Sequence, residues 1–140
     1  MTLDRVFDSL GFSPETQWSQ RIGNIDGVPF YENEHDFLIN KRADDDYRTI
    51  KAWVDAELMP YMTRKSINIR YTSYGLKHIA QKEIGFYVSN GDIKLALMEN
   101  DVPFRAVLYS PNTMYPLSES FFRASCGKRV GKCRAGGEMQ

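Results

Sequence analysis

The stretch from Glu32 to Asp36 gathers the side chains with the clearest potential for chemistry. It holds three carboxylates, Glu32, Glu34 and Asp36, together with the imidazole of His35. Such groups bind divalent metals or transfer protons near neutral pH. A metal-dependent enzyme that uses the Glu32–Asp36 region is therefore one hypothesis. The stretch also falls where a polar loop between strands is expected, and the sequence favours that simpler interpretation.

Two other groups of residues resemble metal ligands only in composition. Asp44, Asp45 and Asp46 lack the glycine and the distal glutamate of a calcium loop, and they suit the first turn of a helix, where the helix dipole favours acids. Cys126 and Cys133 are separated by six intervening residues, unlike the common zinc spacings. We therefore expect no metal and no cofactor.

No established catalytic motif accompanies these residues. The chain has no nucleophile elbow, no phosphate-binding glycine loop and no zinc-protease motif. Its two histidines, His35 and His78, lie 43 positions apart in unlike contexts. The sequence therefore predicts a protein that is not an enzyme.

The charges are divided between the two halves of the chain. Residues 1–60 carry 12 acidic and 6 basic side chains, whereas residues 61–140 carry 12 basic and 6 acidic ones, so the net charge of zero conceals halves of −6 and +6. A uniformly acidic mimic of nucleic acid and a uniformly basic nucleic-acid coat are both disfavoured. No apolar run approaches the length of a membrane span, and we expect a cytoplasmic protein.

The basic side chains near the C-terminus are candidates for phosphate contact. Their binding would be sensitive to salt and blind to sequence. A solubilising end without a binding role explains the same composition equally well. The candidates are Arg123, Lys128, Arg129, Lys132 and Arg134.

Four aromatic residues, Tyr71, Tyr74, Phe86 and Tyr87, cluster around a predicted turn between two helices. They could stack on nucleotide bases, but packing in the core and around the turn is favoured. Tyr74 and Tyr87 are the best candidates for partly exposed residues that contact a partner.

The first 45 residues are predicted to form an acidic extension. Leu3, Val6, Phe7 and Leu10 follow the spacing of a short amphipathic helix. Asp26-Gly27 is a hairpin signal between short strands.

Residues 46–124 are predicted to form the core. Apolar spacing predicts helices over residues 46–59, 73–84 and 90–100, with Ser89 to Asp92 resembling a capping box. Strands are expected over residues 66–71 and 104–109 and again near Phe121 and Phe122. This order is that of a winged helix-turn-helix, so the expected fold class is α+β, with a flexible basic tail over residues 125–140.

The helix over residues 90–100 would be the recognition helix of such a domain. It offers Asn90 and Lys94 to a nucleic acid, but it also carries Asp92 and Glu99. Readers of the major groove usually present arginine, lysine or amides. This composition argues against ordinary sequence-specific reading of DNA and leaves Lys94 and Arg105 as candidate nucleic-acid contacts.

The central segment resembles small uncharacterised proteins of phages and integrated mobile elements. These proteins carry a pattern close to Thr72–His78 (TSYGLKH), then a short spacer, then Gly85–Gly91 (GFYVSNG) and an apolar helix. The preceding helix with Ala52, Trp53 and Val54 also looks similar. The resemblance covers about residues 46–100. It implies a mobile-element origin and supplies no activity, cofactor or catalytic residue.

These observations together predict a non-enzymatic binding protein of a phage or mobile element. One instance would be an anti-CRISPR-like inhibitor of a host nucleic-acid-guided defence complex. The acidic part would face a host protein and the basic tail would face nucleic acid or an acidic patch, with no membrane partner. A winged-helix transcriptional regulator is the alternative. The candidate partner-binding residues are Glu32, Glu34, Asp36, Asp44, Asp45, Asp46, Tyr74 and Tyr87.

Overall fold

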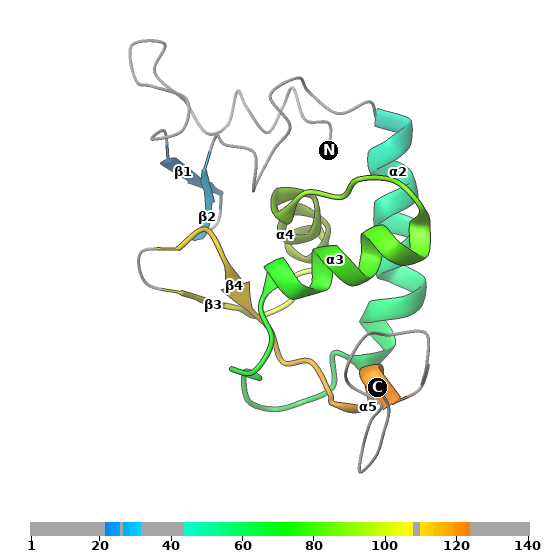
Figure 1. Cartoon of the computed structure of the whole chain (residues 1–140). Helices are drawn as coiled ribbons and strands as arrows, with labels where there is room; N and C mark the ends of the chain where they lie inside the picture. The colour runs from blue at the N-terminus through cyan, green and yellow to red at the C-terminus, as the bar shows by residue number, and fades with distance from the viewer. Residues whose placement is uncertain (1–21, 26, 32–43, 108–109, 124–140) are drawn as a thin grey trace.

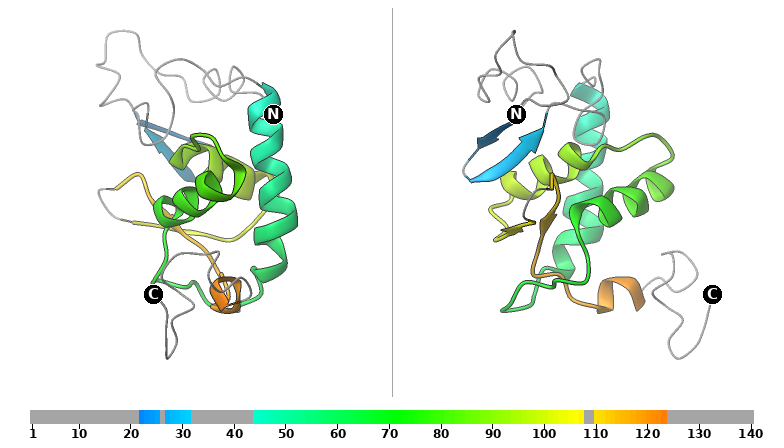
Figure 2. Two further views of the ribbon diagram at one scale, coloured as in Figure 1. Left: turned by 45° about the vertical axis from the view of Figure 1, so that its right-hand side comes forward. Right: turned by 60° about the vertical axis from the view of Figure 1, so that its left-hand side comes forward.

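A computed structural model of the chain describes residues 22–25, 27–31, 44–107 and 110–123 (Figure 1). The predicted helix over residues 3–10 and the predicted basic tail lie outside these residues. Within them, three helices pack together, and two small antiparallel hairpins lie on one side (Figures 1 and 2). The α+β class is therefore confirmed.

The predicted hairpin at Asp26-Gly27 is present. Strand β1 (Ile22–Ile25) pairs antiparallel with β2 (Val28–Tyr31), and Ile25 lies opposite Val28. Gly27 has a φ of 86°, a left-handed conformation that glycine adopts without strain. Val28 is buried and joins the hydrophobic core, so the hairpin packs onto the helices.

The first long helix is α2 (Asp44–Trp53), which continues as the π-helical turn η2 (Val54–Leu58) and the 3₁₀ turn η3 (Met59–Tyr61). Its inner face buries Ile50, Val54 and Leu58, as the apolar spacing predicted. Pro60 stands in the last turn, and the helical chain ends at the next residue.

Helices α3 (Ser73–Ile84) and α4 (Asn90–Glu99) follow the predicted boundaries closely. Gly85 ends α3 with a φ of 100°, and its N–H donates to the carbonyl of Gln81. Ser89 and Asp92 form a reciprocal capping box at the start of α4. Both boundaries are set by residues within one helical turn.

Helix α4 is the centre of the fold. It contacts α2, α3, η2 and β2 (Figure 2), and its residues Asn90 to Leu97 are all buried. Lys94 has no exposed surface, and its Nζ donates to the carbonyl of Pro111 at 2.6 Å. The prediction that Lys94 contacts nucleic acid is therefore wrong for this structure, because the core encloses its ammonium group.

The second hairpin is shorter than predicted. Strand β3 (Arg105–Ala106) pairs antiparallel with β4 (Thr113–Met114), and Thr72 forms an isolated bridge with Met114. The strand expected near Phe121 and Phe122 is wrong. Both phenylalanines are buried in the short helix α5 (Ser120–Arg123), where Phe121 meets Trp53 and Tyr61 edge to face.

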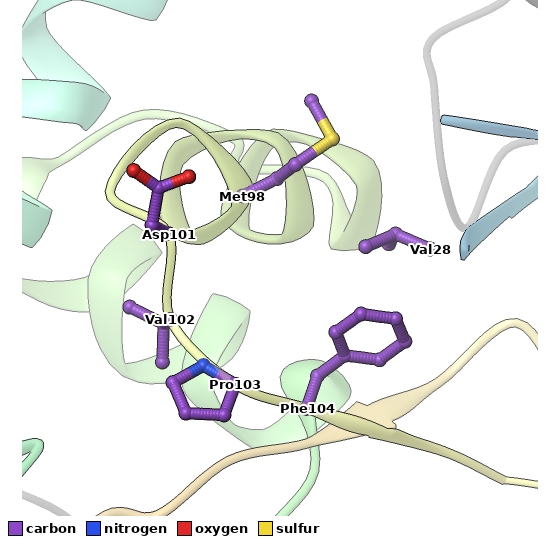
Figure 3. Close-up of a pocket in the computed structure, with 6 residues that line it drawn as sticks. All are labelled: Val28, Met98, Asp101, Val102, Pro103 and Phe104. Carbon is purple, nitrogen blue, oxygen red and sulfur yellow. The ribbon is translucent and has the colours of Figure 1, made fainter. Parts of the chain in front are cut away.

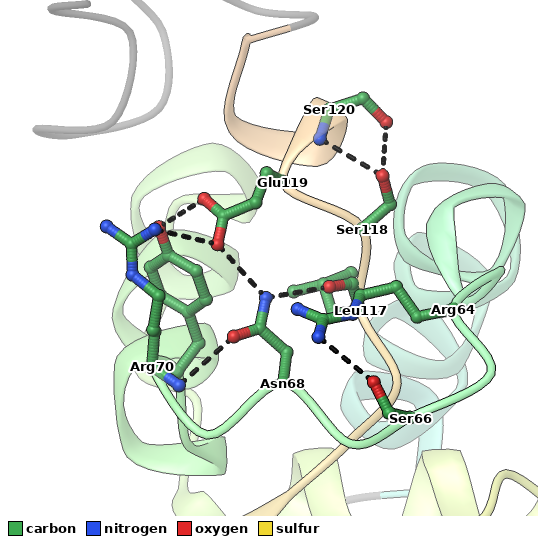
Figure 4. Close-up of polar contacts among 9 residues, drawn as sticks. Arg64, Ser66, Asn68, Arg70, Leu117, Ser118, Glu119 and Ser120 are labelled. Carbon is green, nitrogen blue, oxygen red and sulfur yellow. Dashed lines mark hydrogen bonds and ion pairs between the residues drawn. The ribbon is translucent and has the colours of Figure 1, made fainter.

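The strand expected over residues 66–71 is also wrong, because Asn68 turns inward and holds this segment as a loop (Figure 4). Asn68 is 1% exposed. Its N–H donates to the carbonyl of Tyr115 at 2.9 Å, and its Nδ2 donates to the carbonyl of Leu117 at 2.9 Å and to Glu119 Oε2 at 3.2 Å. Its Oδ1 accepts from the N–H of Arg70. Side-chain bonds thus replace a strand ladder here.

Among the described residues, no helix is long and apolar enough to cross a membrane.

Replacing Asn68 by aspartate tests this anchor. The Asn68→Asp side chain cannot donate to Leu117 and brings a second carboxylate against Glu119. We expect the free energy of unfolding at pH 7 to fall by about 2–4 kcal/mol. Burial and Glu119 would raise the pKa of the new carboxyl above its unfolded value, so part of this loss should be recovered as the pH falls through that pKa.

Urea unfolding followed by tryptophan fluorescence measures the effect. Ser66→Asp is the matched control, because residue 66 is exposed on the same loop. We expect the control to change the unfolding free energy by no more than about 0.5 kcal/mol. Equal stability of the two variants would contradict the anchoring role of Asn68.

Candidate functional site

Three polar or aromatic side chains lie on one face at the start of α3. Tyr74, Lys77 and His78 are spaced by three and four residues, so they neighbour one another on the helix surface. Tyr87 comes from the turn that joins α3 to α4 and approaches the same face. We call the group of Tyr74, Lys77, His78 and Tyr87 the α3 aromatic surface.

The Lys77 ammonium is the centre of this surface. Its Nζ lies 4.5 Å from the ring centroid of Tyr87 and 5.7 Å from that of Tyr74. Both distances allow cation–π attraction, which typically contributes about 0.5–2 kcal/mol and increases as the cation is desolvated. Lys77 is 4% exposed, so its side chain is almost entirely removed from solvent. The lysine therefore helps to fix the positions of two tyrosines.

His78 completes the surface from the next position of the helix. Its ring meets the Tyr74 ring edge to face, with centroids 4.6 Å apart and an angle of 83° between the planes. This arrangement suits the quadrupole of the aromatic ring. Tyr74 thus has Lys77 over its face and His78 at an edge contact, and both restrict its orientation.

The electrostatics of the surface disfavour extra positive charge. Burial lowers the pKa of Lys77, and the negative charge of Asp92 partly opposes that effect. Burial also lowers the pKa of His78, and the nearby charge of Lys77 lowers it further. His78 is therefore mainly neutral at pH 7 and can offer both a donor and an acceptor nitrogen.

Tyr74 and Tyr87 remain accessible despite these contacts. They are 41% and 38% exposed, and of the described large hydrophobic residues only Ile69 is also so open to solvent. Their partial exposure agrees with the expectation from sequence, while their contact with a partner stays a prediction. The position of Lys77 between the two tyrosines was not predicted, although the Tyr-x-x-Lys spacing of Tyr74 and Lys77 on a helix indicates such a contact.

The other predicted site residues lie on separate elements or outside the described part. Asp44, Asp45 and Asp46 form the first turn of α2, where Asp45 pairs with Arg48. Arg105 is exposed on β3 and Arg123 is exposed at the end of α5. Glu32, Glu34, Asp36, Lys128, Arg129, Lys132 and Arg134 lie outside the described residues.

A shallow pocket lies between the first hairpin and the segment after α4 (Figure 3). It has a volume of about 380 Å³ and is lined by Val28, Met98, Asp101, Val102, Pro103 and Phe104. Asp101 is the only charged residue of this lining. Among the residues that the structure covers, no group of three histidine, cysteine or carboxylate side chains could hold a metal ion.

Comparison of the chain with protein-family models, with curated proteins and with solved structures finds no match. The α3 aromatic surface must therefore be interpreted from its own geometry.

A histidine titration tests the electrostatics of this surface. We expect the imidazole of His78 to titrate below the ordinary histidine pKa of about 6.5. The Lys77→Met variant keeps the buried stem but removes the charge, so the midpoint should rise toward the ordinary value while staying below it. NMR spectra of the histidine ring protons across pH 4–8 measure the shift, and His35 is the only other histidine of the chain.

Lys65→Met is the control because residue 65 is exposed on the loop that follows η3. It should leave the His78 midpoint unchanged. Equal midpoints in the wild-type protein and the Lys77→Met variant would show that the two side chains are not electrostatically coupled.

Proposed function

We propose that this protein is a non-enzymatic binding protein of phage or mobile-element origin that occupies a host protein complex. The proposed target is a nucleic-acid-guided defence complex, so the protein would act as an anti-CRISPR-like inhibitor. One observation carries the binding role: Tyr74 and Tyr87 are both partly exposed, and the ammonium group of Lys77 lies over both rings. Inhibition by occupancy requires a stable contact surface and no catalytic group.

Tyrosine is well suited to this task. A few residues carry most of the binding energy of an interface, and tyrosine is enriched among them. The contacts with Lys77 and His78 order both rings before binding, so less conformational entropy is lost on association. A neutral His78 adds a hydrogen-bonding group that a partner can reach without paying for desolvation of a charge.

The position of the surface also supports a protein partner. Helix α3 packs on α4 and α2, so the helices that carry and flank the two tyrosines are packed against one another (Figure 1). The acids at the start of α2 would form a second contact, facing a basic groove of the partner. Glu32, Glu34 and Asp36 would extend that acidic contact.

A winged-helix DNA-binding regulator is the second candidate. The element order supports it, because α2, α3 and α4 precede a two-stranded hairpin and Thr72 bridges Met114 of that hairpin. The burial of Asn90 to Leu97 opposes it, since a recognition helix must offer side chains to a groove. A gel-shift preference of orders of magnitude for one operator over random DNA would favour this candidate.

The aromatic surface predicts a clear binding defect. We expect the double variant Tyr74→Ala/Tyr87→Ala to bind the host complex at least about tenfold more weakly than the wild-type protein, because each tyrosine should contribute more than about 1 kcal/mol. The complex is first isolated from host lysate on the immobilised wild-type chain and identified. Its affinity for each variant is then measured by biolayer interferometry.

Ala56→Ser is the control, since Ala56 is exposed on η2, outside the α3 aromatic surface and outside the acids at the start of α2. It should bind like the wild-type protein. The Tyr74→Phe/Tyr87→Phe variant separates ring contacts from hydroxyl contacts. Recovery of no host complex would contradict the proposed function, and wild-type affinity of the alanine variant would contradict the proposed surface.

A further inference from the structure

The loop between η3 and α3 presents a run of hydrogen-bond donors to solvent. Thr63, Arg64, Lys65 and Ser66 are all exposed, and Arg70 follows near the end of the loop. Residues 61–71 contain three basic side chains and no acidic one. We call residues 63–70 the basic loop.

Hydrogen bonds to the segment before α5 hold the basic loop in one conformation (Figure 4). The N–H of Arg64 donates to the carbonyl of Pro116 at 3.1 Å, and Asn68 makes the bonds to Tyr115 and Leu117 described above. The loop is therefore fixed at both its start and its middle. A ligand that contacts it would not have to order the backbone, and this reduces the entropic cost of binding.

Glu119 is the acidic side chain that contacts this loop. It accepts from the hydroxyl of Tyr71 at 2.8 Å and from Asn68, and it pairs with Arg70 at 3.3 Å. Burial raises its pKa, but these donors and the charges of Arg70 and Arg123 outweigh that effect and lower it. Glu119 therefore stays ionised and offsets one positive charge of the four on Arg64, Lys65, Arg70 and Arg123.

The pairing does not withdraw Arg70 from solvent. Its side chain remains 69% exposed, and its guanidinium lies 5.8 Å from the ring centroid of Tyr71. Arg123 is exposed and close enough to influence both Tyr71 and Glu119 electrostatically. The loop and the end of α5 thus form one region with an excess of positive charge.

We propose that the basic loop, together with Arg123, binds the phosphodiester backbone of a nucleic acid. Arginine, lysine, serine and threonine side chains are among the groups that contact phosphate oxygens, and the exposed run from Thr63 to Ser66 offers all four of these residue types in four consecutive positions. Ile69, 67% exposed, adds an apolar contact for a sugar or base.

A nucleic acid fits this region better than an acidic protein does. The core of a protein interface is enriched in apolar and aromatic residues and depleted in charge. Ile69 is the one exposed large hydrophobic residue of the basic loop, and its sequence neighbours are the buried amide Asn68 and the exposed Arg70. Backbone contacts of this kind carry no sequence information, so binding should be sequence-independent.

This inference goes beyond the proposed function and does not rest on it. The proposed function concerns a host protein at the α3 aromatic surface, whereas the basic loop would bind nucleic acid in the purified protein alone. A failure of either proposal leaves the other standing.

Salt-dependent binding of the full chain tests the proposal. Fluorescence anisotropy is measured with a labelled 20-base-pair DNA duplex and with a labelled 20-nucleotide single-stranded RNA of random sequence, each from 50 to 300 mM salt. The main variant is Arg64→Gln/Lys65→Gln. Arg48→Gln/Lys82→Gln removes the same charge from exposed sites on α2 and α3 and serves as the matched control.

We expect the loop variant to bind the duplex roughly tenfold or more weakly at 0.1 M salt, with a plot of log affinity against log salt that is shallower by about 2. The control should retain most of the wild-type affinity and slope. The charge-preserving exchange Arg64→Lys/Lys65→Arg should also bind, and circular dichroism should show that every variant is folded. Comparison of the two probes shows whether duplex or single-stranded backbone is preferred.

Three results would overturn the proposal. The first is no binding of either probe by the wild-type chain at 50 mM salt. The second is an equal loss in the loop variant and in the control, which would reveal a general effect of net charge. The third is displacement of the probe by polyglutamate as effectively as by unlabelled duplex at equal charge, which would indicate an acidic protein as the partner.

Discussion

Burial of α4 is the constraint on which the rest of the structure depends. The helix lies among α2, α3, η2 and β2, so its polar side chains must find partners inside the protein. Asp92 closes the capping box with Ser89, Lys94 donates to the carbonyl of Pro111, and Asn90 Nδ2 donates to Asn112 Oδ1 at 3.0 Å. The bonds of Lys94 and Asn90 attach the turn of the second hairpin to the core and thereby fix the surfaces around it.

This constraint decides which residues can meet a partner. The charged groups of α4 are held by partners inside the protein. An ammonium group buried without its acceptor would lower the stability of the fold by several kcal/mol. Binding must then use residues on the outside of the helices and in the loops. The α3 aromatic surface and the basic loop satisfy this condition, because both are exposed yet are held by neighbouring structure.

Sequence patterns predicted the features that are determined locally. The hairpin at Gly27, the end of α3 at Gly85 and the capping box at Ser89 each depend on residues a few positions apart. The patterns failed where contacts with residues far away in the sequence determine the local structure. The alternation of Ile67 and Ile69 suggested a strand, but Asn68 bonds to residues 47–51 positions away and is the buried residue, while Ile69 points to solvent. The prediction that Lys94 contacts nucleic acid was wrong for the same reason. The carbonyl that accepts its hydrogen bond belongs to Pro111, which lies beyond strand β3.

The segment from Thr113 to Phe122 links the two candidate surfaces. Its start holds α3, since the N–H of Thr113 donates to Ser73 Oγ at 3.0 Å. Its end holds the basic loop through Leu117 and Glu119, and the Tyr71 ring lies 4.1 Å from that of Phe122. Tyr71 and Ser73 are only two residues apart, so the end of the loop and the start of α3 are fixed to the same segment. Both surfaces are therefore attached to one segment, an arrangement that suits a protein contacting a protein and its bound nucleic acid at once.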